Sequence, residues 1–371
     1  RIEDTDQKRF VPGAEKYILE SLSWSGITPD EGPGIGGAYG PYRQSERKES
    51  YAGFVQQLLE SGHAYYAFDT PEELDQMRNN MRASGVQSPT YNSITRNSMK
   101  NSLTLPKEET EKRMQEGERY VVRVKMPRDK EIKFEDQVRG WVSVNTNHID
   151  DKVIYKSDGM PTYHLANVVD DYSMKITNVI RGEEWLPSAP LHVYLYECFG
   201  WSTSMPFFAH LPLILKPDGN GKLSKRDGDR LGFPVFPIDW HSVENNEVFS
   251  GYRERGFSSS AFINMLAFLG WNPGGDEEVF SLSDLIDQFS LKRVGKSGAK
   301  YDYQKTKWFN QQHLRLNSDL ALFNSVVAIN DTILKSFSKE YILRAISLVK
   351  DRAVFERDIL IEAAYFFSDK V

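Results

Sequence analysis

The sequence contains a single cysteine, Cys198, among its 371 residues. One thiol cannot form a disulfide within the chain, and it cannot supply a zinc site built on several cysteines. Cys198 lies in the apolar stretch 191–199, where we expect a buried structural thiol rather than a nucleophile. The scarcity of cysteine therefore excludes disulfide-stapled scaffolds and cysteine-rich zinc domains.

The sequence also lacks any run of 18 apolar residues, so no membrane-spanning helix is expected. Its charged start has no apolar core of a signal peptide, and we expect a cytoplasmic protein without a membrane partner. An excess of positive charge is missing as well, because 46 basic residues stand against 52 acidic ones, for a net charge of −6. This balance disfavours indiscriminate binding of nucleic acid but leaves local contacts with RNA open.

What is present is typical of a globular protein, with 40% apolar and 26% charged residues. At about 150 residues per domain, the length predicts two to three domains. Spacing of apolar residues predicts helices over 12–24 and from Ser45 to Gly62 in the first part of the chain. Pro12 suits the first turn of the former helix, and Gly62 the end of the latter.

The segment 70–150 differs in pattern from the residues before it, with polar helices followed by alternating strands, and is predicted to be an inserted subdomain. Thr70-Pro71-Glu72-Glu73 is a capping box that opens a polar helix over 71–84. A second polar helix is expected over 106–116. Alternation then predicts a strand with Tyr120, Val122, Val124 and Met126 on one face.

From Val153 onward strands and helices alternate, which favours a parallel α/β sheet. The elements expected there are a strand over 175–180, a helix over 190–199 and a strand over 207–215. After about Phe236 the pattern is helical, and the expected helices are 259–269, 281–289, 303–313, 319–328, 339–351 and 353–367.

Two glycine motifs have no nucleotide-binding context. Gly32, Gly34 and Gly37 form G-x-G-x-x-G, but no apolar strand precedes them and Tyr39-Gly40-Pro41 cannot begin a helix. Gly221-Lys222 has neither the earlier glycine nor the Ser/Thr of a phosphate-binding P-loop. We therefore interpret both motifs as ordinary loops.

A basic run, Lys222-Leu223-Ser224-Lys225-Arg226, is predicted as a loop after the flexible stretch 217–221. Two lysines three residues apart can reach one polyphosphate, and an arginine adds a bidentate donor. From the pattern alone, a solvated charged turn is an equally good interpretation.

Three other segments contain candidate binding residues. The chain opens with Arg1-Ile2-Glu3-Asp4-Thr5-Asp6, which could be a simple acidic turn. The segment 157–171 could be a turn followed by core residues. Arg181-Gly182-Glu183-Glu184-Trp185 follows a predicted strand, and the carboxyl ends of strands line ligand crevices in open α/β sheets.

In order and spacing, these segments resemble a bacterial-type glutamyl-tRNA synthetase, a class I aminoacyl-tRNA synthetase, over essentially the whole chain. The basic run is similar to that family's KMSKS motif. The resemblance implies an α/β fold: a Rossmann-like catalytic domain with an inserted α/β subdomain, followed by an all-α C-terminal region. The implied domains are the catalytic domain (1–69 and 151–235), the acceptor-end-binding insertion (70–150), a helical stem-contact domain (236–315) and the start of a helical anticodon-binding domain (316–371).

The resemblance assigns contacts with glutamate to four residues. Glu3 would receive the α-ammonium, Tyr163 and Asn167 would face the substrate, and Arg181 would pair with the side-chain carboxylate. A guanidinium fork suits a planar carboxylate, and it would reject neutral glutamine because a buried charge would stay unpaired. His164 receives no assigned role, and a surface ion pair is the alternative for Arg181.

Contacts with ATP and tRNA are assigned in the same way. Lys222, Lys225 and Arg226 would act on the ATP phosphates as the catalytic group, and Glu184 and Trp185 would bind ATP, Glu184 at its ribose. Towards tRNA, the resemblance implies Asp6 and Arg9 near the acceptor end and Trp308 at the stem, with core packing as a good alternative for Trp308.

The implied activity is ligation of L-glutamate to its tRNA, using ATP with Mg²⁺ and a glutamyl-adenylate intermediate. No covalent enzyme intermediate and no protein-bound metal are expected. Zinc is not expected because the segment His63 to Phe68 has no cysteine. We expect a monomer.

The sequence departs from the family at its ends. The family's HIGH segment would precede Arg1, and its last helices would follow Val371. A non-catalytic tRNA-binding fragment of the same enzyme therefore stays open as an alternative. Glutaminyl-tRNA synthetase is a second alternative, although it typically opens with Asp-Asp-Thr-Asn and lacks Arg-Gly-Glu-Glu-Trp.

Overall fold

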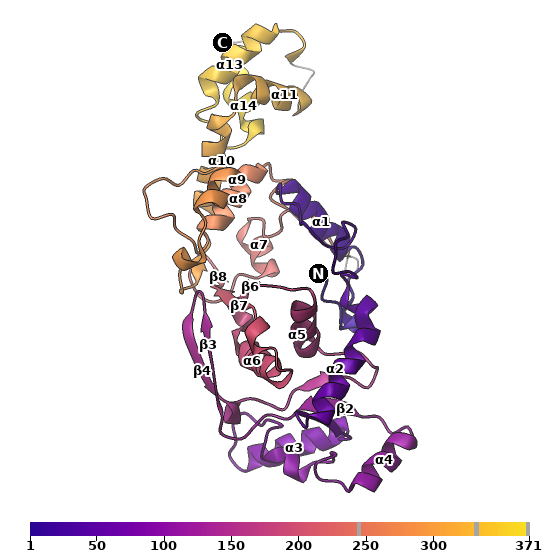
Figure 1. The fold of residues 1–371 in the computed structure, drawn as a ribbon. Coiled ribbons are helices and arrows are strands. Elements are labelled where there is room, and N and C mark those ends of the chain that lie inside the picture. The colour runs from indigo at the N-terminus through magenta and orange to yellow at the C-terminus, as the bar shows by residue number, and fades with distance from the viewer. Residues whose placement is uncertain (243–245, 330–333, 369–371) are drawn as a thin grey trace. The chain divides into compact units, whose positions relative to one another are not determined.

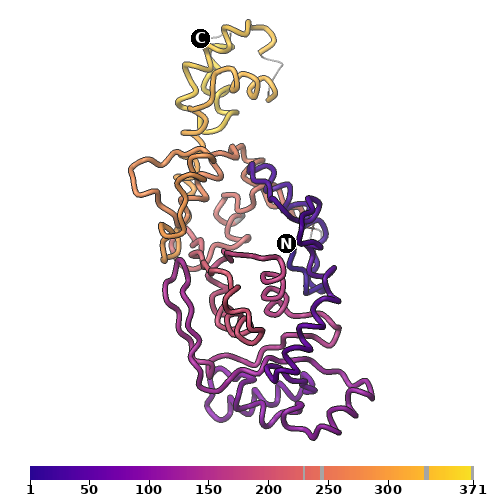
Figure 2. Tube along the Cα trace, viewed as in Figure 1, coloured from indigo at the N-terminus to yellow at the C-terminus, as the bar shows by residue number. Residues whose placement is uncertain are grey.

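The computed structural model describes residues 1–242, 246–329 and 334–368 (Figure 1). The chain divides into two compact units. The first contains residues 1–11 and 29–210, and the second contains residues 12–28 and 211–371. The course of the chain through each unit can be followed in Figure 2.

The first unit contains a four-stranded sheet in the order β4-β3-β7-β6. β3 and β4 form an antiparallel hairpin, whereas Asp136 of β3 pairs in parallel with Phe208 of β7. This hairpin lies in the range predicted for the insertion, yet it shares a sheet with the later strands. The strands are β3 (Glu131–Asp136), β4 (Gly140–Asn145), β6 (Asn178–Gly182) and β7 (Phe207–Leu211).

A second sheet in this unit has three antiparallel strands in the order β1-β2-β5. Val122, Val124 and Met126 are buried, and Tyr120 packs against the same core, so the predicted apolar face is confirmed. The strands are β1 (Ala64–Ala67), β2 (Val121–Val124) and β5 (Val153–Tyr155).

Five α-helices belong to the described part of this unit. The capping box of Thr70 and Glu73 is present, as predicted, because each residue's side chain accepts from the other's backbone N–H. α5 was missed as a helix, although its residues 165–171 form the predicted buried segment. The helices are α2 (Lys48–Glu60), α3 (Pro71–Ala83), α4 (Lys107–Gln115), α5 (Tyr163–Ser173) and α6 (Ala189–Cys198).

α6 packs against α5 and β3 and ends at Cys198. That side chain is half-buried, and burial raises the pKa of its thiol to about 11. A thiol with so high a pKa is almost entirely protonated near neutral pH, which fits a structural role better than nucleophilic chemistry.

The second unit is mainly helical. Its helices are α1 (Ala14–Trp24), α7 (Lys225–Leu231), α8 (Ser259–Phe268), α9 (Leu282–Gln288), α10 (Tyr303–Leu316), α11 (Asp319–Ile329), α13 (Lys339–Val349) and α14 (Glu356–Glu362). Short strand pairs join β8 (Ile214–Leu215) to β11 (Ala299–Lys300), and β9 (Trp240–His241) to β10 (Val248–Phe249).

Several predicted boundaries were wrong. The strand expected over 175–180 is β6, at Asn178–Gly182. α1 begins at Ala14 rather than Pro12, with Gly13 as its N-cap at a φ of +83° that favours glycine. The strand expected over 207–215 is interrupted at Pro212, which has no N–H for a sheet hydrogen bond. The last helix is shorter than 353–367, because α14 gives way to a 3-10 turn at 364–366.

No helix in the part of the chain that the structure describes is long and apolar enough to cross a membrane.

Candidate functional site

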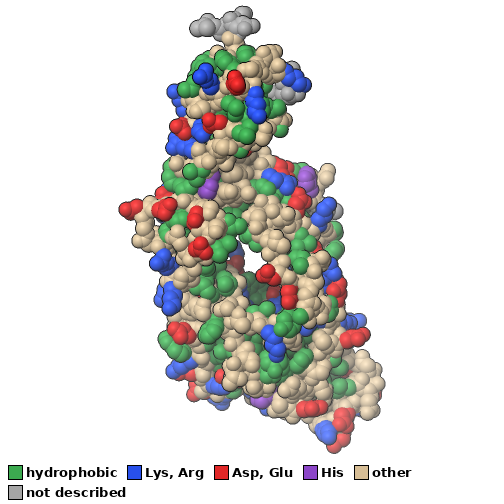
Figure 3. Space-filling view, turned by 45° about the horizontal axis from the view of Figure 1, so that its top comes forward, with side chains coloured by type: hydrophobic (Ala, Val, Ile, Leu, Met, Phe, Trp, Pro, Cys, Tyr) green, Lys and Arg blue, Asp and Glu red, His purple; other side chains and the backbone are tan. Residues whose placement is uncertain are grey.

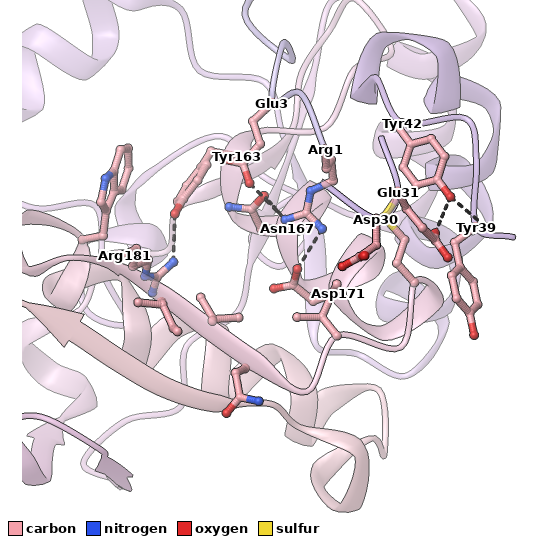
Figure 4. A pocket seen from close by; sticks show the side chains of 16 residues that line it. Arg1, Glu3, Asp30, Glu31, Tyr39, Tyr42, Tyr163, Asn167, Asp171 and Arg181 are labelled. Atoms are coloured by element: carbon pink, nitrogen blue, oxygen red, sulfur yellow. Dashed lines mark hydrogen bonds and ion pairs between the residues drawn. The ribbon is translucent and has the colours of Figure 1, made fainter. Parts of the chain in front are cut away.

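A pocket of about 650 Å³ opens in the first unit (Figure 4). Four residues proposed from the sequence as glutamate contacts line it, together with Trp185. The pocket is built mainly from the opening segment, α5 and β6. Its lining includes Arg1, Glu3, Glu31, Tyr42, Tyr163, Asn167, Asp171, Arg181 and Trp185.

Secondary structure brings the central side chains together. Tyr163 and Asn167 lie four residues apart on α5, so they share one face of the helix. Arg181 lies near the carboxyl end of β6, and Trp185 belongs to the 3-10 turn that follows. The Tyr163 and Trp185 rings pack with their centroids 4.5 Å apart, so they form an aromatic wall of the pocket.

Neutral side chains hold the Arg181 guanidinium. Its Nη1 donates to the hydroxyl of Tyr163 at 2.8 Å, and its Nε donates to Nε2 of His210 at 3.0 Å. Nη2 is buried and has no hydrogen-bond partner among the residues described. Arg181 thus brings a positive charge to this pocket, and the N–H groups of its Nη2 are not used by Tyr163 or His210.

His210 is in turn fixed by Asp136. Its Nδ1 lies 2.6 Å from Oδ2 of Asp136, and neither side chain is exposed. Burial alone would raise the pKa of Asp136. The hydrogen bonds from His210 and from backbone N–H groups outweigh burial and hold that pKa below its ordinary value. Asp136 is therefore ionised at neutral pH.

Two further histidines lie beside Arg181. His192 Nδ1 is 3.5 Å from Arg181 Nη1, and His192 Nε2 is 3.2 Å from His164 Nδ1. Burial lowers the pKa of His164 to about 4 and that of His192 well below its ordinary value. Both rings are neutral near pH 7, so they add no positive charge to that of Arg181.

The other side of Tyr163 carries acidic groups (Figure 4). Arg1 donates to Asp171 at 2.7 Å, to Glu3 at 3.0 Å and to Asn167 at 3.2 Å. Burial raises the pKa of Asp171 against the opposing effect of Arg1. The pocket therefore offers a cation at Arg181 and carboxylates near Arg1, an arrangement suited to a ligand with separated charges.

The remaining predicted residues of the first unit lie outside the lining of this pocket. Glu184 is exposed, with its carboxylate folded over Gly182. Asp6 caps the 3-10 turn 7–9 through the N–H of Lys8 and pairs with Arg9 at 3.3 Å. The Asp6 and Arg9 side chains are exposed, so nothing in their packing opposes contact with a large partner.

In the second unit, the basic run is only partly a loop. Lys222 forms a bridge with Leu215, but Lys225 and Arg226 are the first residues of α7. The predicted loop was therefore wrong for its last two residues. Ser224 and Asp227 form a capping box, which places Lys225 at the start of a helix.

Asp227 stabilises this helix start. A hydrogen bond from the Ser224 hydroxyl, helped by Arg230 and Lys216, lowers the pKa of Asp227. Lys222, Lys225 and Arg226 are all exposed. The amino end of a helix favours anions, so α7 adds to the positive potential around Lys225.

Trp308 lies on α10 and is half-buried against an apolar cluster of the second unit. The ammonium of Lys305 lies 3.8 Å from the centroid of its ring. This environment fits the core-packing alternative, and contact with tRNA stays a prediction.

Comparison with known proteins decides the family. Residues 1–308 match the family of class I tRNA synthetases (E and Q), catalytic domain. The chain is 55% identical over 367 residues to the glutamate–tRNA ligase of Amoebophilus asiaticus, covering 99% of this chain and 72% of that protein. This chain belongs to the glutamate–tRNA ligase family.

Solved structures agree. The glutamate–tRNA ligase of Elizabethkingia meningosepticum, solved in complex with its amino acid, superposes with a TM-score of 0.94 at 52% identity, over 99% of this chain and 73% of that one. The glutamate–tRNA synthetase of Elizabethkingia anophelis gives 0.92 at 52% identity, over 99% and 74%. The mixed α/β catalytic part with helices after it is thus the fold of a class I synthetase, as predicted.

Residues behind the pocket hold part of its lining in place. Gln44 is buried and donates to Asn167 at 3.2 Å and to Asp170 at 3.0 Å, while Arg47 pairs with Asp170 at 2.8 Å. Together they fix the face of α5 that carries Asn167. Both belong to the segment 40–47, which matches a further block of the resembled family and was expected to shape the site rather than to react.

Sequence reasoning missed His210 and Asp136, because they are 74 positions apart and meet only through strand pairing. In the described ranges no group of three or more His, Cys, Asp or Glu side chains could hold a metal ion. The absence of zinc stays a prediction.

Proposed function

We propose that this chain activates L-glutamate with ATP and transfers the glutamyl group to its tRNA. The observation that carries the proposal is the Arg181 guanidinium, which lines a pocket containing Glu3 and keeps two buried N–H groups without an acceptor among the described residues. A substrate carboxylate supplies the missing acceptor with charge assistance.

Selection against glutamine follows from the same contact. The amide of glutamine is neutral, so its binding leaves the half-buried cation of Arg181 unpaired. Sites that leave a buried polar group unpaired reject the wrong substrate strongly. Arg181 thereby discriminates between glutamate and glutamine, which differ only in the terminal group of the side chain.

The opposite end of glutamate binds near Arg1. Glu3 accepts the α-ammonium, since an ammonium–carboxylate pair is a charge-assisted contact. Tyr163 and Asn167 orient the substrate between the two charged ends. The α-carboxylate is then left available for reaction.

ATP supplies the energy, with Mg²⁺ bound to its phosphates. Lys222, Lys225 and Arg226 stabilise charge on the phosphates, while Glu184 and Trp185 bind the nucleoside. A glutamate α-carboxylate oxygen attacks the α-phosphorus, and pyrophosphate leaves. A ribose hydroxyl of tRNA then attacks the glutamyl carbonyl, and AMP leaves. Positioning and charge stabilisation supply catalysis without an enzyme nucleophile.

Asp6, Arg9 and Trp308 contact tRNA in this proposal. Basic and acidic side chains are interspersed over the face of the molecule in Figure 3. With a net charge of −6 for the whole chain, this surface supports recognition by local contacts rather than by a uniformly basic surface.

The test is glutamate-dependent exchange between pyrophosphate and ATP in the presence of tRNA, together with charging by labelled glutamate. We expect exchange and charging with glutamate and none above background with glutamine or aspartate. Equal activity with glutamine would contradict the assignment of Arg181. Binding of tRNA without exchange would instead favour the non-catalytic alternative.

A further inference from the structure

Three neighbouring strands of the first unit carry a continuous line of polar side chains. Asp136 ends β3, His210 lies on β7 and Arg181 lies on β6, and the sheet order places these strands side by side. The line runs from Asp136 Oδ2 to His210 Nδ1 at 2.6 Å, and from His210 Nε2 to Arg181 Nε at 3.0 Å. Only Arg181 reaches the pocket.

The donors along this line determine the state of His210. The Nε–H of Arg181 can only donate, so Nε2 of His210 accepts and carries no proton. The imidazole proton therefore sits on Nδ1 and is donated to Asp136. Asp136 is held in turn, because its Oδ1 accepts from the backbone N–H groups of Val138, Arg139 and His210 at 2.9–3.2 Å.

The order of these groups also determines the charge that a substrate meets. The side chains that contact Arg181, namely Tyr163, His192 and His210, are all neutral. The anion that fixes the line, Asp136, lies one side chain farther from the guanidinium. A carboxylate in the place of His210 would hold Arg181 equally well but would neutralise it.

We propose that Asp136 and His210 are positioning residues that hold Arg181 through a neutral acceptor, so that its charge stays available to the side-chain carboxylate of the amino acid. The inference rests on the proposed function, since it explains how Arg181 selects an acidic substrate. Neither residue touches the substrate. By fixing the tautomer of His210, the protein orients Arg181 without pairing its guanidinium with a carboxylate.

The substitution Asp136→Asn tests the tautomer. An asparagine keeps Oδ1 for the three backbone N–H groups but presents an N–H₂ donor to Nδ1 of His210. The imidazole proton then moves to Nε2, where it faces the Nε–H of Arg181, donor against donor. We expect the Kd and KM for glutamate to rise roughly 10- to 100-fold, the loss of a hydrogen bond to a charged group, while the KM for ATP changes less than about twofold.

A second pair of variants keeps the test valid if Asp136→Asn fails to fold. His210→Gln retains an acceptor for Arg181, whereas His210→Leu has a similar size and no acceptor. We expect the Gln variant to bind glutamate at least about tenfold more tightly than the Leu variant. Asp75→Asn, at an exposed ion pair on α3, is the matched control and should change neither constant.

The outcomes are separable. Normal glutamate binding by the parent, with Asp136→Asn unchanged or with the Gln and Leu variants equal, would overturn the positioning role alone. Equal increases in the KM for glutamate and for ATP would also overturn it, because they indicate a general structural defect. A parent that binds no glutamate in calorimetry would overturn the proposed function and this inference with it.

Discussion

Replacement of Arg181 by alanine isolates the contact on which substrate choice depends. The change removes the donor to Tyr163 and His210 and leaves the side-chain carboxylate of a bound glutamate without a cation. Breaking a buried charge pair from one side costs about 3–5 kcal/mol. At about 1.4 kcal/mol per tenfold change, the Kd for glutamate should rise about 10²- to 10³-fold or somewhat more.

The assay is the KM for glutamate in tRNA-dependent pyrophosphate–ATP exchange, with the KM for ATP measured on the same samples. The side chains around Arg181 are neutral, so its removal strands none of them as an unpaired charge. Because Nε2 of buried His210 loses its donor, we expect a small fall in the thermal midpoint with the fold retained. Arg181→Lys should not restore binding, because an ammonium cannot reproduce the fork that spans Tyr163 and His210.

Arg78→Ala on α3 is the control, since Arg78 forms an exposed ion pair with Asp75 at 2.7 Å within one helix. Such pairs contribute little, and the variant should behave as the parent does. A KM for glutamate in Arg181→Ala within about twofold of the parent would refute the assignment of Arg181 to the substrate carboxylate.

Three other predictions concern separate parts of the chain. Lys225→Ala should slow adenylate formation by about 10²- to 10³-fold, the effect of losing one preorganised charge, in single-turnover kinetics; a rate within a few-fold of the parent would exclude its role. Ser224→Ala removes the hydroxyl that donates to Asp227 at the start of α7 and should cost about 1 kcal/mol of local stability, measured as faster amide hydrogen exchange in 225–231. Unchanged exchange would show that this hydrogen bond is dispensable. Burial lowers the pKa of His164 to about 4 from an ordinary 6.5. As pH falls, the unfolded chain therefore binds this proton before the folded chain does, and folding stability should decline between about pH 6.5 and 4. The urea midpoints at pH 7 and pH 5 should differ less in His164→Gln than in the parent, and equal differences would contradict this origin.

Local signals made much of the helical structure predictable. The capping box at Thr70 and the apolar spacing within 259–269 are patterns that neighbouring residues determine, and α3 and α8 follow them closely. The same kind of signal was present at Ser224 and Asp227, three residues apart, but the glycines before it and the basic residues within it favoured a loop. A cap signature outweighs charge in such a segment because it satisfies backbone donors directly.

The pocket was predictable only where the resemblance supplied it. Glu3, Tyr163, Asn167 and Arg181 do line one pocket, but their roles remain predictions. Residues behind them, such as Asp136, have no local signature, since an aspartate ending a strand reads as a turn residue. Its contact with His210 depends on which strands become neighbours in the sheet, and periodicity carries no information on strand order.

The three-stranded sheet limits how this protein can be trimmed. Its middle strand, β2, belongs to the segment 70–150, whereas β1 and β5 flank that segment in sequence. Buried Asp151 adds a second tie, because it accepts from Tyr65 before the segment and from Arg96 within it. Excision of 70–150 would therefore leave two strands without the partner that joins them and a buried carboxylate without its cation. The segment is therefore an integral part of this unit. A minimal version of this protein would have to retain β2 and Arg96, and also the β3–β4 hairpin, which shares a sheet with β7 and carries Asp136.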